Sequence, residues 1–138
     1  MYTFNKKERL CNKSVISKLY ASQSRLMVFP LSIHWLITDN TQPCRLQVVI
    51  VAPKKKLHHA VDRNRAKRLM RECYRMRKGR LLEYLERRDM SMVIGINYIH
   101  NEILDYHQLA YRFDKVFDTL INHLESTEKP SNQQEDGC

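Results

Sequence analysis

The chain has 138 residues, of which 43% are hydrophobic, and a formal net charge of +9 at pH 7. This length and composition fit one domain with a single buried core, and no run approaches the ~18 apolar residues of a membrane span. Three glycines in the whole chain argue against a glycine-rich phosphate loop or a nucleotide-binding fold. The excess of positive charge favours nucleic acid or another anionic surface as a partner.

The first elements are an arm and a short helix. Residues 2–10 are polar with two apolar positions and predict an extended arm. A helix follows from Asn12 or Ser14 to Tyr20, with a short apolar stripe and either polar residue as its N-cap.

Two β-rich segments come next. Residues 26–38 predict one strand, broken or bent at Pro30, because proline cannot donate to the hydrogen-bond ladder. After a turn at 39–43, the run 46–52 (LQVVIVA) is apolar on both faces. It predicts an inner strand that pairs with the preceding strand as a hairpin.

A helical segment and a third strand follow. Residues 60–77 contain no Gly or Pro and predict a helix, which we expect Gly79 to end. Residues 80–88 predict a short additional helix, and residues 90–99 predict a strand.

The chain closes with a core helix and a tail. Asp105 predicts the N-cap, with Gln108 as its capping-box partner, and apolar residues recur at helical spacing as far as Leu124. The polar segment 126–138 predicts a disordered tail, which leaves 1–125 as the domain. The order is α-β-β-α-β-α, a small sheet packed by helices in an α+β sandwich.

The cysteines and the N-terminus indicate a cytoplasmic protein. The four cysteines at positions 11, 44, 73 and 138 form no C-x-x-C pair and show no metal-ligand spacing. We therefore expect reduced thiols. The opening residues, MYTFNKKERL, lack the apolar region of a signal peptide.

Half of the positive charge lies in one fifth of the chain. Residues 54–80 hold 12 of the 24 Lys and Arg residues but only two acids, Asp62 and Glu72. At roughly 100° per residue, one side of the predicted helix is apolar, formed by Ala66, Leu69, Met70 and Cys73. The opposite side carries Asn64, Lys67, Arg68, Arg71 and Arg75, with Arg63 and Arg65 flanking both faces. Because four like charges on one face repel each other, a polyanion such as a phosphate backbone is the expected partner.

Other functions fit parts of this pattern. A solvated face is the general alternative for a charge run, and a basic helix also suits the major groove of DNA, although a strand precedes this one where a helix-turn-helix would have a helix. A stand-alone nuclease finds little support, because no motif for Ser-His-Asp, Cys-His or H-E-x-x-H chemistry is present. His58 and His59 are not predicted to bind metal, because adjacent side chains diverge and no third ligand is evident.

The segment AVDRNRAKRLMRECYR, residues 60–75, resembles the signature of the bacterial ribonuclease P protein subunit. That family carries a basic R-N-R-x-K-R core after a strand that ends in a Lys-rich turn. The matching positions are Arg63, Asn64, Arg65, Lys67 and Arg68, followed by Arg71. Phe4, Lys7, Arg9 and Leu10 resemble the N-terminal opening of the family. The element order agrees over about residues 4–124.

The resemblance implies a ribosomal protein S5 domain 2-like fold with a left-handed β-α-β crossover, an exception to the usual right-handed rule. It also implies a subunit of the endonuclease that removes the 5′ leader from precursor tRNA. The partners are then a catalytic RNA, which holds Mg²⁺ and performs the hydrolysis, and the single-stranded leader. The protein raises substrate affinity, and none of its side chains is expected to be catalytic.

Site residues are carried over by position. The resemblance assigns the leader to a cleft between the sheet and the basic helix, lined by Arg63, Asn64, Lys67, Arg71 and Tyr20. It assigns the RNA subunit to Arg65 and Arg68. Further candidates for RNA contact are Arg75, Lys54, Lys55, Lys56, Lys7 and Arg9, with a solvated loop as the alternative for the three consecutive lysines. Candidates for stacking on unpaired bases are Tyr20, Phe29 and Trp35, for which core packing is the alternative.

Two positions depart from the family pattern. His58 stands where the family usually has a glycine, so the connection PKKKLHH must turn without one. Ile16 stands where the family often has a second cleft aromatic, which removes part of the expected stacking surface.

Overall fold

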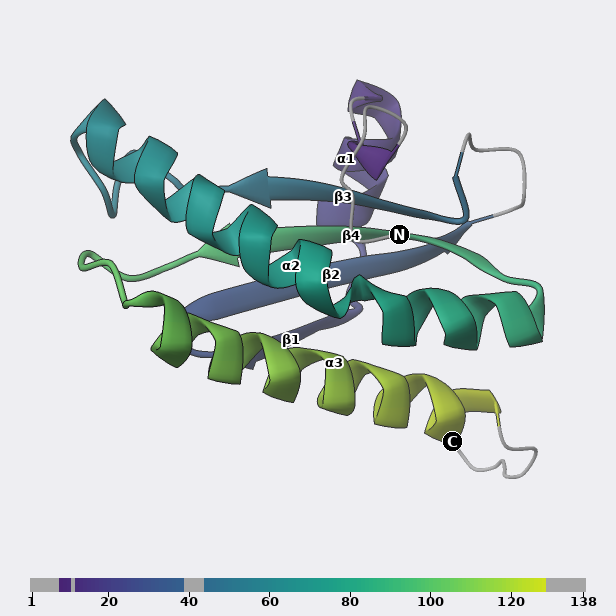
Figure 1. The fold of residues 1–138 in the computed structure, drawn as a ribbon. Helices are drawn as coiled ribbons and strands as arrows, with labels where there is room; N and C mark the ends of the chain where they lie inside the picture. Colours follow the sequence, from purple (N-terminus) through teal and green to yellow (C-terminus); the bar gives the residue numbers. More distant parts are fainter. Residues whose placement is uncertain (1–7, 11, 39–43, 129–138) are drawn as a thin grey trace.

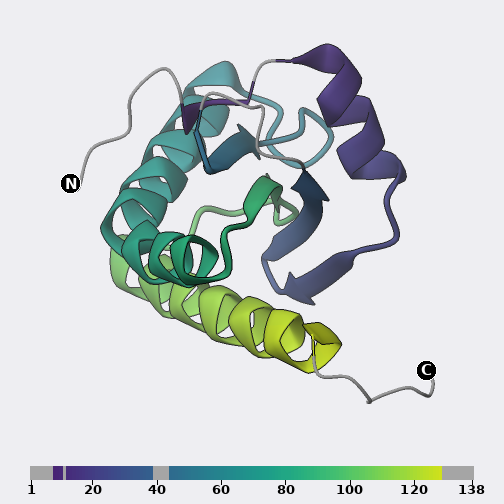
Figure 2. The ribbon, with the colours of Figure 1, turned by 90° about the vertical axis from the view of Figure 1, so that its right-hand side faces the viewer.

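The computed structural model describes residues 8–10, 12–38 and 44–128. One four-stranded sheet is covered on one face by two long helices and on the other by one short helix (Figures 1 and 2). The α+β class and the packing of a small sheet by helices are confirmed. In chain order the elements are α1 (Lys13–Ala21), β1 (Arg25–Val28), β2 (Leu31–Thr38), β3 (Leu46–Val51), α2 (Ala60–Arg88), β4 (Ser91–Tyr98) and α3 (Tyr106–Glu128).

The strand predicted over 26–38 is in fact two strands. β1 and β2 are antiparallel neighbours, and Val28 pairs with Leu31 across the turn at Phe29 and Pro30. Proline lacks the N–H that a continuous strand would need at this point, and the chain reverses there. Of the two predicted alternatives, the break at Pro30 is therefore confirmed and the bend is wrong, and the reversal gives the sheet an edge strand.

The predicted hairpin between β2 and β3 is also wrong. The sheet order is β1-β2-β4-β3, with β4 antiparallel to β2 and parallel to β3. The inner strands are therefore β2 and β4, and β3 lies at an edge. Nearly all residues of β4 are buried. The apolar pattern of β3 suits an inner strand because the described part of the N-terminal arm covers that edge. There the Leu10 N–H donates to the Val48 carbonyl at 2.8 Å.

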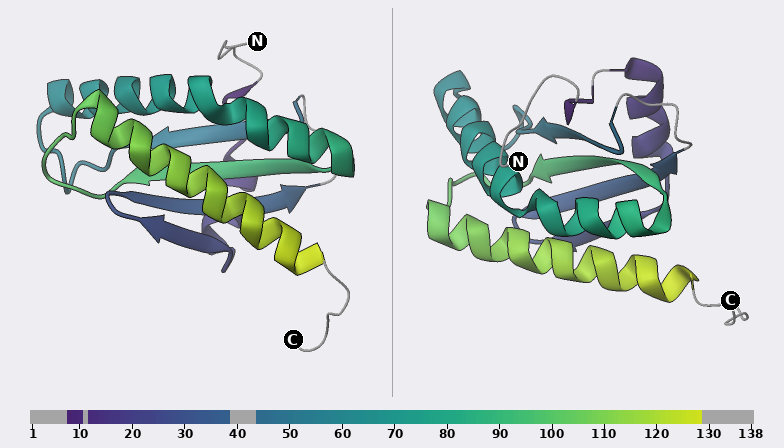
Figure 3. Two further views of the ribbon diagram at one scale, coloured as in Figure 1. Left: turned by 60° about the horizontal axis from the view of Figure 1, so that its bottom comes forward. Right: turned by 45° about the vertical axis from the view of Figure 1, so that its right-hand side comes forward.

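Helix α2 continues through Gly79, where it was predicted to end. Its second half stays helical because Leu81, Tyr84 and Leu85 are buried in the core, and packing of this kind outweighs the weak helix propensity of one glycine. The helix changes direction partway along its length (Figures 1 and 3). It ends at Asp89, which adopts the left-handed conformation with φ 51°.

Helix α3 begins as its capping box predicts. The Gln108 N–H donates to Asp105 Oδ1 at 2.9 Å, and the Asp105 N–H donates to Gln108 Oε1 at 3.3 Å. The helix lies beside α2 (Figure 3) and continues to Glu128, three residues into the predicted tail. Its buried stripe consists of Leu109, Ala110, Phe113, Val116, Phe117, Leu120 and Leu124.

Two apolar clusters lie on opposite faces of the sheet. The larger cluster joins the sheet to α2 and α3, with Tyr74, Tyr98 and Phe113 among its fully buried members. The smaller one lies under α1 and contains Leu19 and Val93. Since α2 belongs to the larger cluster, burial of one side fixes which of its residues face outward.

Candidate nucleic-acid interface

The outward side of α2 presents cations without internal partners. The basic face comprises Asn64, Arg65, Lys67, Arg68 and Arg71. On the opposite side of the same turns, Ala66, Met70 and Cys73 are fully buried, so the helix is held against the core while this face is exposed or half-buried. Within residues 8–10, 12–38 and 44–128, the four cations of the basic face make no hydrogen bond or ion pair.

The cations on either side of the basic face are instead occupied within the fold. Arg63 donates through Nη1 to the Leu57 carbonyl at 3.0 Å and to the His58 carbonyl at 2.9 Å. Arg75 donates through Nε to Glu72 Oε1 at 3.3 Å. This hydrogen bond lowers the pKa of the Glu72 carboxyl. The predicted acid-free stripe therefore ends at Arg71, and Arg63 has a structural role at the start of the helix.

Further along α2, the positive charges hold the helix to its neighbours. Arg77 pairs with Asp114 of α3 at 2.8 Å, and Arg80 pairs with Asp118 one turn later. Lys78 is buried and pairs with Glu8 of the N-terminal arm. Arg77, Lys78 and Arg80 therefore stabilise the fold through ion pairs. The cations of the basic face, earlier in the same helix, are available to a binding partner.

Tyr20 lies on the other face of the sheet. Its hydroxyl donates to Asn97 Oδ1 at 3.0 Å, and its ring centroid is 4.8 Å from that of His34. Burial raises the pKa of Tyr20, and the hydrogen bond to Asn97 offsets part of this effect. The absence of a side chain at Gly95 admits the tyrosine onto the strand. Because α1 and α2 pack on opposite faces of the sheet (Figure 1), the structure does not bring Tyr20 against the basic face.

The other two aromatic candidates have different environments. Trp35 is 5% exposed, and its ring lies edge-on to His123 of α3 with centroids 5.2 Å apart. Its predicted stacking role is wrong, because its alternating position on β2 points into the core. Phe29 is 51% exposed in the turn between β1 and β2, with its ring centroid 5.1 Å from that of His100.

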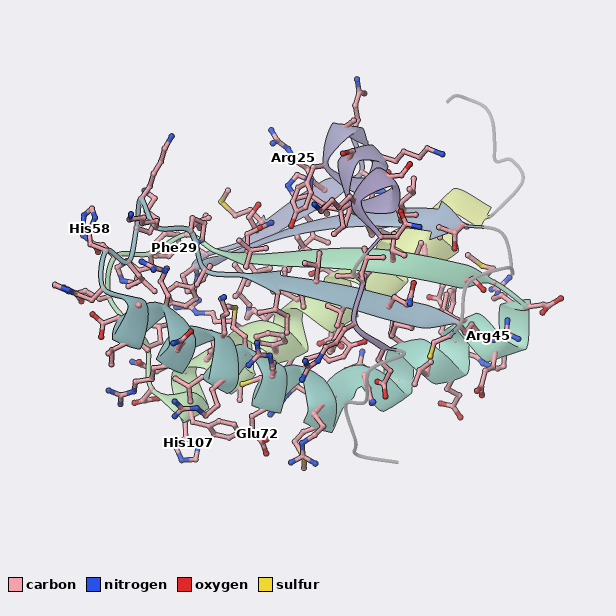
Figure 4. All side chains as sticks on the ribbon, turned by 90° about the horizontal axis from the view of Figure 1, so that it is seen from above. Arg25, Phe29, Arg45, His58, Glu72 and His107 are labelled. Atoms are coloured by element: carbon pink, nitrogen blue, oxygen red, sulfur yellow. The ribbon has the colours of Figure 1, made fainter. Side chains whose placement is uncertain are left out.

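A pocket of about 570 Å³ opens beside Phe29. Phe29 and His58 lie at the same end of the sheet, away from Arg45 (Figure 4). Of the three consecutive lysines, Lys55 and Lys56 line the pocket, and Lys54 is exposed next to them. Among the described residues, the lining is Phe29, Lys55, Lys56, Leu57, His58, His59, Asp62, Ile99, His100 and Asn101.

The connection from β3 to α2 turns without the family glycine. The N–H groups of Lys56 and Leu57 both donate to the Pro53 carbonyl at 3.2 Å, and Leu57 is 4% exposed. His58 follows this anchor and is exposed. From the sequence, His58 and His59 are considered only as a metal pair, which is not predicted. His100 goes unnoticed because no local motif links it to them.

The N-terminal candidates are only partly described. Arg9 is exposed and pairs through its backbone with Val48 of β3, whereas Lys7 lies outside the described residues. Across the described part of the chain, no group of three His, Cys, Asp or Glu side chains gathers as metal ligands do. Among the same residues, no helix has both the length and the apolar character that crossing a membrane requires.

Comparisons with known proteins agree on one family. The family model described as Ribonuclease P matches residues 4–121. The ribonuclease P protein component of Porphyromonas gingivalis is 25% identical over 126 residues, covering 91% of this chain and 92% of that protein. The component from Chlorobaculum tepidum is 41% identical over 76 residues, covering 53% of this chain and 49% of its own.

Solved structures show the same fold. The RNase P protein of Staphylococcus aureus superimposes with a TM-score of 0.63 at 16% identity, covering 82% of this chain and 94% of that one. A mutant of that protein, described as defective in mRNA degradation activity, gives the same TM-score at 15% identity. The family model spans most of the chain, including the whole basic face, and the chain therefore belongs to the Ribonuclease P family.

Proposed function

We propose that this chain binds the catalytic RNA of ribonuclease P and the 5′ leader of precursor tRNA, and so supports removal of that leader in the cytoplasm. Family membership makes the chain an RNA-binding component of a tRNA-processing ribonuclease. The observation that carries the finer proposal is the row of four cations on α2 that lack partners within the described residues.

The chemistry of this row suits a phosphate backbone. Each Lys or Arg that neutralises a phosphate releases a condensed counterion, which favours binding without reading sequence. A subunit that serves many different leaders needs this kind of contact. Asn64 adds a side chain that both donates and accepts directed hydrogen bonds.

The division of labour is the one that the family resemblance implies. Arg65 and Arg68 contact the RNA subunit, while Asn64, Lys67 and Arg71 contact the leader. Mg²⁺ and the hydrolytic step belong to the RNA in this scheme, and the protein raises affinity for the substrate.

The principal test measures processing of precursor tRNA by the cognate RNA at low Mg²⁺, with and without this chain. We expect stimulation by the protein. Absence of stimulation would refute the proposed function.

Two variants test the division of labour. Arg68→Ala is expected to weaken binding to the RNA subunit and to reduce the salt slope by about one unit. Lys67→Ala is expected to weaken mainly the binding of leader-containing substrate by the holoenzyme. Arg87→Ala, on the exposed far end of the same helix, is the matched control and should change neither affinity. Equal affinity of the holoenzyme for precursor and mature tRNA contradicts the leader assignment.

The DNA-binding alternative gains no support from the comparisons. A competition experiment separates the two, because a preference for duplex DNA over structured RNA would favour it. A stand-alone nuclease predicts Mg²⁺-dependent cleavage by rigorously RNA-free protein, which we do not expect.

A further inference from the structure

The pocket beside Phe29 is built from three connections that are far apart in the sequence. They are the β1–β2 turn, the β3–α2 connection and the segment after β4. The Ile99 N–H donates to the Pro30 carbonyl at 2.8 Å and ties two of these walls together. Arg63 holds the third wall through the Leu57 and His58 carbonyls. Since these walls are fixed by internal contacts, the pocket is preformed.

Two rings of the pocket lining, Phe29 and His100, offer an aromatic surface. Phe29 leaves 51% of its surface exposed, and His100 lies against it with an angle of 55° between the ring planes. An exposed phenylalanine within a recess presents a flat apolar face to a ligand of similar shape. A nucleobase has that shape, and bases stack on such side chains with little preference for their identity.

The polar residues of the lining supply groups that suit a phosphate and a ribose. Lys55 and Lys56 are exposed and make no side-chain hydrogen bond or ion pair with any residue that the structure describes. The Asn101 N–H donates to His100 Nδ1 at 3.1 Å, so the neutral imidazole carries its proton on Nε2 and can donate it to a ligand. Asp62 is the one carboxylate that the described residues bring to the lining. It can accept a hydrogen bond from a ribose hydroxyl, and the two lysines outweigh its charge.

We propose that this pocket holds one unpaired ribonucleotide, with its base against Phe29 and His100 and its phosphate against Lys55 and Lys56. The inference rests on the proposed function, because it takes RNA as the partner, but it concerns a site separate from the basic face. Pockets for small ligands occupy about 300–1,000 Å³, and a volume of about 570 Å³ accommodates one nucleotide. A paired base is stacked within its duplex, so the ligand is single-stranded. Its two sources are the leader of the precursor and an unpaired segment of the catalytic RNA.

The test uses the holoenzyme assembled from the full chain and its cognate RNA. Phe29→Ala and His100→Ala are compared with Met27→Ala, which is 63% exposed on β1 but does not line the pocket. One arm measures holoenzyme affinity for precursor and for mature tRNA. The other arm measures protein affinity for the catalytic RNA alone. All three side chains lie at the surface, and thermal unfolding confirms that the variants fold.

The outcomes distinguish the sources. If the nucleotide belongs to the leader, Phe29→Ala weakens precursor binding about tenfold, toward the lower end of what one stacked base contributes, and leaves mature tRNA unaffected. If it belongs to the catalytic RNA, the same loss falls on the second arm. The pocket proposal is overturned if both variants match Met27→Ala in both arms while Arg68→Ala still weakens RNA binding. Failure of the unaltered chain to bind the RNA would instead refute the proposed function.

Discussion

Gly95 carries the most specific stability prediction, because it lies beneath α1. A Cβ added there would come within 2.7 Å of Tyr20 Oη, 3.0 Å of Tyr20 Cζ and 3.1 Å of Leu19 Cδ2. Gly95→Ala must therefore displace the tyrosine ring or lift α1. Overpacking of this kind costs about 1–3 kcal/mol, and the lost Tyr20–Asn97 hydrogen bond costs about 1 kcal/mol more. Replacing a glycine within a strand by alanine offsets roughly 0.5–1 kcal/mol of this loss, because the unfolded chain becomes less flexible.

The expected net loss is about 2 kcal/mol of unfolding free energy. For 138 residues the unfolding entropy is about 0.3 kcal/mol/K, so Tm should fall by roughly 7 °C. Differential scanning calorimetry or thermal circular dichroism measures this shift.

Gly79→Ala is the matched control. Gly79 lies within α2, and a Cβ added there would have no heavy atom of a neighbouring group within 4 Å, so the same substitution should raise stability by about 0.5–1 kcal/mol. In the background of Tyr20→Ala, Gly95→Ala should lose most of its penalty, because the closest clash is removed. If Gly95→Ala raises Tm as Gly79→Ala does, the close approach of α1 to β4 is refuted.

Three further predictions concern buried or capping groups. Lys78→Met removes the buried cation that pairs with Glu8 and should lower the free energy of unfolding, measured in urea, by about 3 kcal/mol. The double variant Lys78→Met/Glu8→Gln should recover most of this loss. Burial raises the pKa of the Cys73 thiol to about 11, so little thiolate forms at pH 8. Mass spectrometry should then show slower alkylation by iodoacetamide at Cys73 than at half-buried Cys44. Equal alkylation rates would contradict the burial of the Cys73 thiol. Asp105→Ala removes the capping box of α3 and should lower unfolding free energy by about 1 kcal/mol, whereas an unchanged urea midpoint would argue against the cap.

Long elements with a strong pattern were predictable. The last helix was placed from its apolar spacing and from Asp105 with Gln108, and both hydrogen bonds of the capping box are present. The basic face was placed on the outside of its helix because burial of Ala66 and Met70 dictates the orientation of the remaining positions. Local periodicity carries this information whatever the rest of the chain does.

Predictions that needed a non-local partner failed. β3 pairs with β4, which follows a 29-residue helix in the chain. The alternation of apolar residues within a strand does not indicate which other strand lies beside it. Trp35 lies on a strand, as predicted, but its side chain is buried because α3 covers that face of the sheet. The local sequence pattern does not indicate this contact. Gly79 was predicted to end its helix because its propensity is local, whereas Leu81 and Leu85 keep the helix intact through burial in the core.

The amino-acid sequence by itself determined the class of partner, because charge density and helical spacing place a row of cations on one side of a rigid element. It also determined the family, through the run of residues from Arg63 to Arg71. Only the tertiary structure decided which positive charges are available, because ion pairs with Asp114 and Asp118 depend on α3 lying beside α2. It alone assembled the pocket at Phe29, since three connections meet there only when the strand order places their ends together.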